Sequence, residues 1–362
     1  MAQFLTNERY GSGSDGYYAP STGTDAPIDS ACTGTISTTS LSATNASFAT
    51  GQVILIHQTQ GTGAGQWELN VVSSYATGTI TTKYALTYGY VTGAQVLVLK
   101  QYSNALIDTG VTLTAKAWNG TVGGIVGWLC NGLTTITGTI GASGIAASGG
   151  TGGSGIGFRG ADSAGAPPGR QGESSTGTGG LSSSANGMGG GGDGDDSAGA
   201  GGGGHATSGG TGVSSGGGAG GGTGGNAGLT TMLFGGAGGA ASQASNGAGG
   251  GSGGIVLIIS KTITITGNIY SNGGAGGNAA NDGGGGGAGG SVLLKGQALT
   301  LGTTKITATG GAAGDGVQFD GGAGGDGRIH ADYFSSISGT TSPTLDSSQD
   351  NTLGDSFYGA MI

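Results

Sequence analysis

Glycine constrains this chain more than any other residue, because 93 of its 362 residues are glycine. They concentrate between Gly144 and Gly327 and include uninterrupted runs such as residues 283–287. Glycine has no side chain to bury and loses the most backbone entropy on ordering, so a hydrophobic core cannot explain this region. The region is therefore either a mobile linker or a set of backbones that pack directly on one another.

The charge and hydropathy of the chain argue against nucleic acid and against a membrane as its partners. The chain has 10 Lys and Arg against 19 Asp and Glu, a net charge of −9, and only 8% of its residues are charged. Nucleic-acid binding needs clustered Lys and Arg that neutralise phosphates, so a nucleic-acid partner is not expected. No apolar stretch approaches the roughly 18 residues of a membrane span, so membrane insertion is not expected either.

The first third of the chain carries the signals of short β-strands. Residues 53–58 and 95–100 are apolar runs of strand length, separated by turn residues such as those at 61–65. Regular short strands of this kind predict a β-sandwich or barrel-like domain over residues 51–118. Residues 1–50, which mix Tyr, Pro, Ser and Thr, are expected to form an N-terminal arm with the first strands.

An internal repeat follows this domain. Glycine pairs at 123, 253, 289 and 324 each precede an apolar strand, and a Thr/Ile-rich strand follows in the first three copies. The last three copies recur at intervals of about 35 residues, within the range of solenoid repeats. We expect a first β-repeat at 119–143 and further repeats with glycine-rich excursions at 254–338, stacked in a solenoid-like column. The alternative is one strand pair per repeat in a conventional sheet.

The longest glycine-rich stretch, residues 144–253, lies between the first repeat and the second. It has no strict Gly-X-Y register and few prolines, which excludes collagen. If ordered, it is expected to form polyglycine-II-like helices with three residues per turn and no internal hydrogen bonds. Their N–H and C=O groups must then pair between neighbouring helices. The predicted fold is thus all-β: an N-terminal β-domain, then solenoid-like repeats with a polyglycine-II-like insert.

The sequence Gly-Gly-Ala-Gly-Gly recurs at 235–239, 273–277 and 321–325. In this feature and in composition, residues 144–327 resemble the glycine-rich tip adhesins of tailed-bacteriophage fibres. The resemblance implies a sandwich of polyglycine II helices that presents loops at its distal end to the host surface. The region is also similar to glycine-rich bacterial surface proteins. The β-rich N-terminal part and the Ile/Thr repeats depart from the phage adhesins.

Side chains too large for a glycine lattice interrupt the glycine-rich segment, and on exposed loop tips they would make effective contacts. The binding candidates chosen on this basis are Phe158, Arg159, Arg170, His205, Met232 and Phe234. The alternative for the apolar members, including Phe158 and Phe234, is that they plug the ends of the lattice or cover the β-column.

Asp193, Asp195 and Asp196 form the densest acidic cluster. An Asp-rich glycine loop can hold Ca²⁺ through carboxylates and carbonyls, and the alternative is a solvated acidic loop. No other cofactor is expected. A polysaccharide depolymerase would need two carboxylates across a cleft, for which Asp315, Asp320 and Asp326 are the candidates, unless they form turns beside glycine.

Both ends of the chain are expected to dock on other subunits. The candidates are Tyr10, Tyr17 and Tyr18 in the N-terminal arm and Phe357 and Tyr358 in an apolar tail at 339–362. They predict a homo-oligomer or an assembly with other virion or filament subunits. Core packing is the expectation for three tryptophans, Trp67, Trp118 and Trp128, with a carbohydrate platform as the alternative for Trp67. Cys32 and Cys130 are expected to be buried thiols or one disulfide.

The first ten residues have neither a basic n-region nor an apolar h-region, so they do not predict a secretory signal. An extracellular-type composition without such a signal favours a virion. The sequence thus predicts a non-enzymatic virion protein: a tail-fibre, receptor-binding or decoration protein that contacts a host glycan or outer-membrane protein. The alternative is a bacterial extracellular filament subunit or cell-surface structural protein, and a depolymerase is third.

Overall fold

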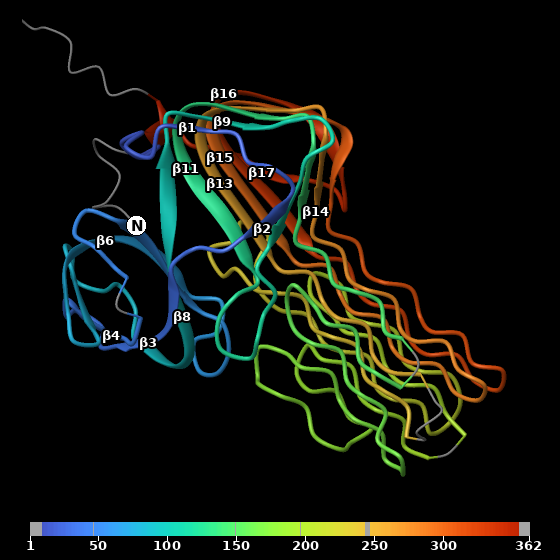
Figure 1. Ribbon diagram of the computed structural model, residues 1–362. Helices are drawn as coiled ribbons and strands as arrows, with labels where there is room; N and C mark the ends of the chain where they lie inside the picture. Colours follow the sequence, from blue (N-terminus) through green and yellow to red (C-terminus); the bar gives the residue numbers. More distant parts are fainter. Residues whose placement is uncertain (1–8, 46, 149, 196, 243–246, 355–362) are drawn as a thin grey trace, which may run out of the picture.

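The structure is a computed structural model that describes residues 9–45, 47–148, 150–195, 197–242 and 247–354. Within these ranges the regular secondary structure is β-strand, apart from one short 3-10 helix, η1 (Asn351–Leu353). The predicted all-β class is therefore confirmed. Figure 1 shows a small barrel beside a layer of long parallel strands, with the glycine-rich segment extending away from both.

The barrel consists of six antiparallel strands. They are β3 (Asp29–Gly34), β4 (Ser40–Ala43), β5 (Val53–Gln58), β6 (Trp67–Ala76), β7 (Thr79–Thr82) and β8 (Tyr90–Tyr102). Pairing runs from β3 through β4, β7, β6, β5 and β8 back to β3, which closes the barrel and leaves no free edge. Leu41, Ile54, Ile80 and Val96 fill its interior. The barrel thus begins before residue 51, because β3 and β4 complete the ring.

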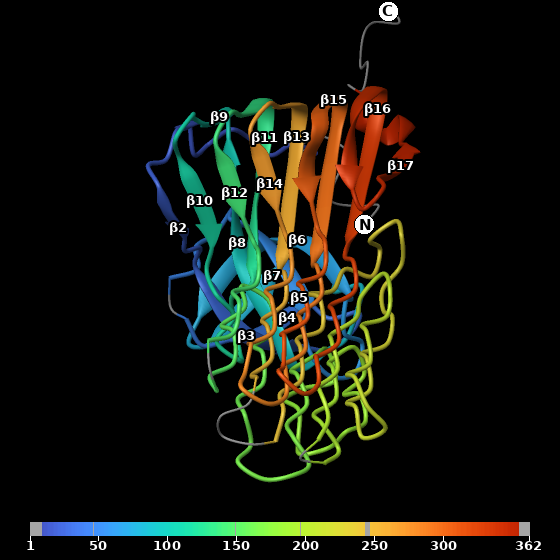
Figure 2. The same cartoon turned by 90° about the vertical axis from the view of Figure 1, so that its right-hand side faces the viewer.

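The remaining strands form a parallel sheet. They are β1 (Tyr17–Tyr18), β2 (Gly23–Asp25), β9 (Asn104–Ile107), β10 (Thr112–Ala115), β11 (Ile125–Ile136), β12 (Thr139–Gly141), β13 (Ile255–Ile265), β14 (Asn268–Tyr270), β15 (Ser291–Thr307), β16 (Arg328–Ser342) and β17 (Asp346–Gln349). The four sequence repeats supply β11, β13, β15 and β16, which pair in register. Val126, Val256, Val292 and Ile329 are therefore direct neighbours. Figure 2 shows these strands side by side.

The repeat strands are buried on both faces where they begin, which explains their continuous apolar runs. On one face Val126, Val256 and Val292 lie in the core enclosed by the repeats. On the other face Ile255 and Leu257 pack in a second cluster with residues of the barrel and of the glycine-rich segment. We call this second cluster the junction core, because residues of all three parts meet there.

In the glycine-rich segment, backbone hydrogen bonds join neighbouring stretches of chain with a period of three residues. The N–H groups of residues 236 and 239 donate to 204 and 201, those of 237 and 240 to 173 and 170, and those of 238 and 241 to 250 and 247. The stretch at residues 236–241 therefore pairs with three neighbouring stretches. Packing is so close that a Cβ on Gly190 or Gly285 would lie 1.9 Å from the carbonyl oxygen of Gly201. Only glycine fits at such positions.

Candidate functional site

The three apolar binding candidates lie inside the molecule rather than on loop tips. Phe158, Met232 and Phe234 are at most 1% exposed and belong to the junction core. The rings of Phe158 and Phe234 are 5.1 Å apart, and Trp118 packs against both. The loop-tip prediction is wrong for these residues, because they fill the space where the glycine-rich segment meets the barrel and the sheet.

His205 is also buried, which corrects its placement on an exposed loop. Its Nδ1 lies 2.9 Å from the carbonyl oxygen of Gly289, and burial lowers the pKa of the imidazole to about 4. The ring is therefore neutral near pH 7 and donates from Nδ1. His205 acts as a tie between two glycine-rich stretches and is not available to a ligand at the surface.

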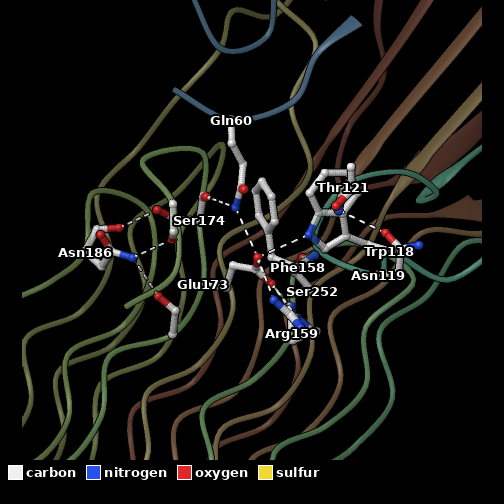
Figure 3. A network of polar contacts seen from close by, with 12 residues as sticks. Gln60, Trp118, Asn119, Thr121, Phe158, Arg159, Glu173, Ser174, Asn186 and Ser252 are labelled. Atoms are coloured by element: carbon white, nitrogen blue, oxygen red, sulfur yellow. Dashed lines mark hydrogen bonds and ion pairs between the residues drawn. The ribbon is translucent and has the colours of Figure 1, made fainter. Parts of the chain in front are cut away.

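Glu173 organises a polar network that the sequence analysis missed (Figure 3). Its buried carboxylate accepts hydrogen bonds from Gln60 of the barrel at 3.1 Å and from the Trp118 indole at 3.2 Å. Arg159 adds two from its guanidinium and one from its backbone N–H. Glu173 is the only glutamate after Glu68, and a lone glutamate in a glycine-rich run is the signal that singles it out. With its oxygens occupied, it holds the barrel and the glycine-rich segment together.

Two of the predicted residues, Arg159 and Arg170, come together at the surface. They line one open cavity of about 530 Å³ with Asp162, Gln171 and Thr178, which we call the arginine groove. The groove lies between adjacent stretches of chain, since the N–H of Glu173 donates to the carbonyl of Arg159. A volume of this size is within the range of small-molecule sites.

The two guanidinium groups of the arginine groove differ in their partners. Arg159 donates from Nε and Nη2 to Glu173 at 3.0 and 3.2 Å, and these hydrogen bonds raise its pKa. Arg170 is exposed and forms no ion pair with any residue that the structure describes. Arg170 is thus the cation in this groove that can meet an anionic group from outside.

The acidic cluster is split between different environments. The buried Asp193 carboxylate accepts from the N–H of Gly169 and from the N–H and hydroxyl of Ser242, and burial raises its pKa to about 6. Asp195 is exposed and accepts from the N–H of Ser197, while Asp196 lies outside the described residues. Among the residues that can be described, no three His, Cys, Asp or Glu side chains are grouped so as to hold a metal ion. Asp193 is a structural carboxyl group, so the calcium prediction is wrong for it.

Two of the three carboxylates considered for hydrolysis accept hydrogen bonds from backbone N–H groups. Asp320 accepts from the N–H of Gly316, and Asp326 accepts from the N–H of Gly310. Asp315 is exposed, and its N–H bonds to the Asn278 side chain. Asp320 and Asp326 are six residues apart at opposite ends of one glycine-rich stretch, or roughly 19 Å at the rise of an extended glycine helix. That separation is far beyond a carboxylate pair.

A set of exposed loops lies at the end of the glycine-rich segment that points away from the barrel (Figure 1). We call residues 213–216, 278–281 and 315–320 the far-end loops. Ala279 pairs with Gly316, and the N–H of Val213 donates to the carbonyl of Asp320, so these loops adjoin one another. Val317 is 83% exposed and Val213 is 48% exposed. The sequence analysis missed them because an apolar residue between glycines does not reveal at which end of a stretch it lies.

The docking candidates near the two termini differ in their exposure. Tyr10 is buried and contacts the C-terminal segment of its own chain, and Tyr18 stacks on Tyr102 with ring centroids 4.3 Å apart. Tyr17 is 61% exposed. Phe357 and Tyr358 lie outside the described residues.

The tryptophans and cysteines are core residues. Trp67, Trp118 and Trp128 are at most 3% exposed, which leaves Trp67 no surface to offer as a carbohydrate platform. Its indole N–H donates to the carbonyl of Leu229. Cys32 and Cys130 are both buried free thiols.

No protein-family model matches this sequence, and no curated protein matches it either. The likeness to phage tip adhesins therefore rests on the glycine pattern alone. In the described part of the chain, no helix is long and apolar enough to cross a membrane.

Proposed function

We propose that this chain is a non-enzymatic structural and adhesive protein of a virion, a tail-fibre, receptor-binding or decoration protein. It contacts the host surface, a glycan or an outer-membrane protein, through the far-end loops. The observation that carries the proposal is the position of those loops at the free end of a closely packed glycine segment. A rigid support with exposed loops at one end suits recognition, because little order is lost when a ligand binds.

The rigidity has a specific physical source. We interpret the period-three hydrogen bonds as a lattice of polyglycine II helices, each with three residues per turn. We interpret the parallel repeats as a solenoid-like column from which the lattice is suspended. Glu173 and the junction core tie the lattice to the barrel and to the column, and His205 ties two glycine-rich stretches to each other. The binding energy then depends on the loops, and several copies in one particle add avidity.

A subunit of a bacterial extracellular filament is the second candidate. One observation favours it: β17 is exposed along its whole length at the edge of the parallel sheet. An exposed edge strand can pair with a strand of a second copy. Electron microscopy of the native assembly separates the two candidates, because copies on a phage head, tail or fibre support the virion and a homopolymeric filament overturns it.

Adhesion is tested with purified protein on a panel of bacterial cells. Val317→Asp places a charge on the far-end loops at a position that is 83% exposed, and we expect it to reduce cell binding at least tenfold. Ile36→Asp is the matched control, since Ile36 is 55% exposed on the barrel side of the molecule. Equal binding by the two variants, or no binding by the unmodified protein to any cell that its particle infects, would overturn the proposed adhesion.

A further inference from the structure

The arginine groove combines one fixed guanidinium with one that has no side-chain partner among the described residues. Arg159 is held by two hydrogen bonds to Glu173, whose carboxylate is itself fixed by Gln60 and Trp118. This bracing orients Arg159 before any ligand arrives, and its Nη1 makes no hydrogen bond with the residues that the structure describes. Arg170 faces the same cavity from the adjacent stretch of chain.

We propose that the arginine groove binds a sugar that carries a carboxylate, such as a uronic acid unit of a surface polysaccharide. Arginine recognises planar carboxylates through paired N–H donors, and Arg170 has its donors available. The other polar groups suit a sugar: Thr178 offers a hydroxyl, and the exposed Asp162 offers carboxylate oxygens that accept from sugar hydroxyls. The cavity of about 530 Å³ is lined without any aromatic side chain, so recognition depends on hydrogen bonds and charge.

The charge of the whole protein restricts the ligand further. With a net charge of −9, the chain repels densely charged polyanions such as sulfated chains. Within the groove, Glu173 neutralises Arg159, and the exposed Asp162 adds a second negative charge. One isolated carboxylate among neutral hydroxyls therefore fits better than several adjacent charges. This inference deepens the proposed adhesive function by naming a second contact site and its ligand class.

The test uses the purified full-length chain on a glycan array. The array carries oligosaccharides with uronic or sialic acid units, each beside its methyl ester, and sugar phosphates as a third set. We expect binding to carboxylate sugars, with a loss of at least tenfold on esterification. Arg170→Gln should lose binding to the same extent. Lys305→Gln removes one positive charge from β15, away from the groove, and should bind as the unmodified protein does.

Each outcome bears on the proposal. Equal binding of acids and esters, no binding to any carboxylate sugar, or unchanged binding by Arg170→Gln would overturn it. Binding confined to sugar phosphates would overturn the carboxylate assignment. Thermal unfolding of Arg170→Gln should match that of the unmodified protein, because the side chain is exposed. The array does not involve cells, so its failure leaves the Val317 adhesion test as an independent measure of the proposed function.

Discussion

The phenol of Tyr10 donates a 2.6 Å hydrogen bond to the backbone carbonyl of Leu353, 343 residues further along the chain. Arg9 adds a hydrogen bond from Nη1 to the carbonyl of Gly354 at 3.2 Å. The two ends of the described chain are thus joined at one place, beside β16 and η1. Tyr10, which was expected to dock on a neighbouring subunit, instead joins the two ends of its own chain.

Removing the Tyr10 hydroxyl should loosen the C-terminal segment. We expect Tyr10→Phe to reduce the free energy of unfolding by about 1 kcal/mol, because a carbonyl in a buried contact loses its donor. Tyr17→Phe, at a position 61% exposed, should have no measurable effect. Denaturant unfolding measures the stability, and limited proteolysis reports whether the segment at residues 350–354 is released. If both variants unfold alike, the contact between the ends contributes nothing.

Glycines at the closest backbone contacts of the glycine-rich segment should not tolerate alanine. A methyl group on Gly285 would lie 1.9 Å from the Gly201 carbonyl oxygen, so Gly285→Ala should cost about 3 kcal/mol or more. Gly180→Ala is the control, since its nearest neighbour would be a Gln171 side-chain atom at 3.8 Å. Thermal unfolding compares the two. In the unmodified protein, amide hydrogen exchange across residues 236–241 should be slow, and exchange at the rate of an unfolded chain would rule out the ordered lattice.

The carboxylate of Glu173 should be required for the junction between the barrel and the lattice. In Glu173→Gln an amide group replaces one acceptor and faces the donors of Arg159, Gln60 and Trp118. We expect a loss of about 2 kcal/mol, since hydrogen bonds to a charged group are lost while one partner, Arg159, stays partly exposed. Asp315→Asn, at an exposed site, should leave the unfolding midpoint unchanged. Chemical denaturation tests both.

The three histidines should titrate in two separate ranges. Burial lowers the pKa of His57 and of His205 to about 4, whereas hydrogen bonds and charge from Asp332 and Asp346 raise the pKa of His330 despite its burial. An NMR titration of the ring signals should therefore give two values well below 6.5 and one above it. A common value near 6.5 for all three would contradict these environments.

These shifts determine how stability changes with pH. Between pH 6.5 and 4 the unfolded chain binds protons that folded His57 and His205 do not, so acidification through this range reduces their contribution. His330 has the opposite sign: its contribution is present below the unfolded pKa and is lost as pH rises through the folded value. The pKa of Asp193 is raised to about 6, so folded Asp193 binds a proton more readily than the unfolded chain does. Its contribution to the stability of the protein therefore increases as the pH falls below 6. Replacing His57 by Gln should flatten the acid side of the stability profile.

Periodic patterns were the most predictable part of this fold. The repeat strands beginning at Ile125, Ile255 and Ser291 carry equivalent apolar residues, and these residues are neighbours because parallel pairing in register aligns them. The barrel was predictable from its short apolar strands. The first residue of the barrel was not predictable, because β3 and β4 contain Ser and Thr and lack an apolar run. Only their pairing with β8 and β7 shows that they belong to the barrel.

The functional surface depended on information that no local pattern carries. The sequence alone identified the region where backbones could pack directly on one another. It did so because the absence of a side chain is a property of each glycine residue by itself. It also identified Arg159 and Arg170 as exposed cations. Tertiary structure decided which interruptions of the lattice face inward and which face out. Phe158 and Phe234 are buried because their ends of the glycine-rich stretches meet the junction core. Val317 is exposed because it lies at the other end of a similar stretch, which faces solvent.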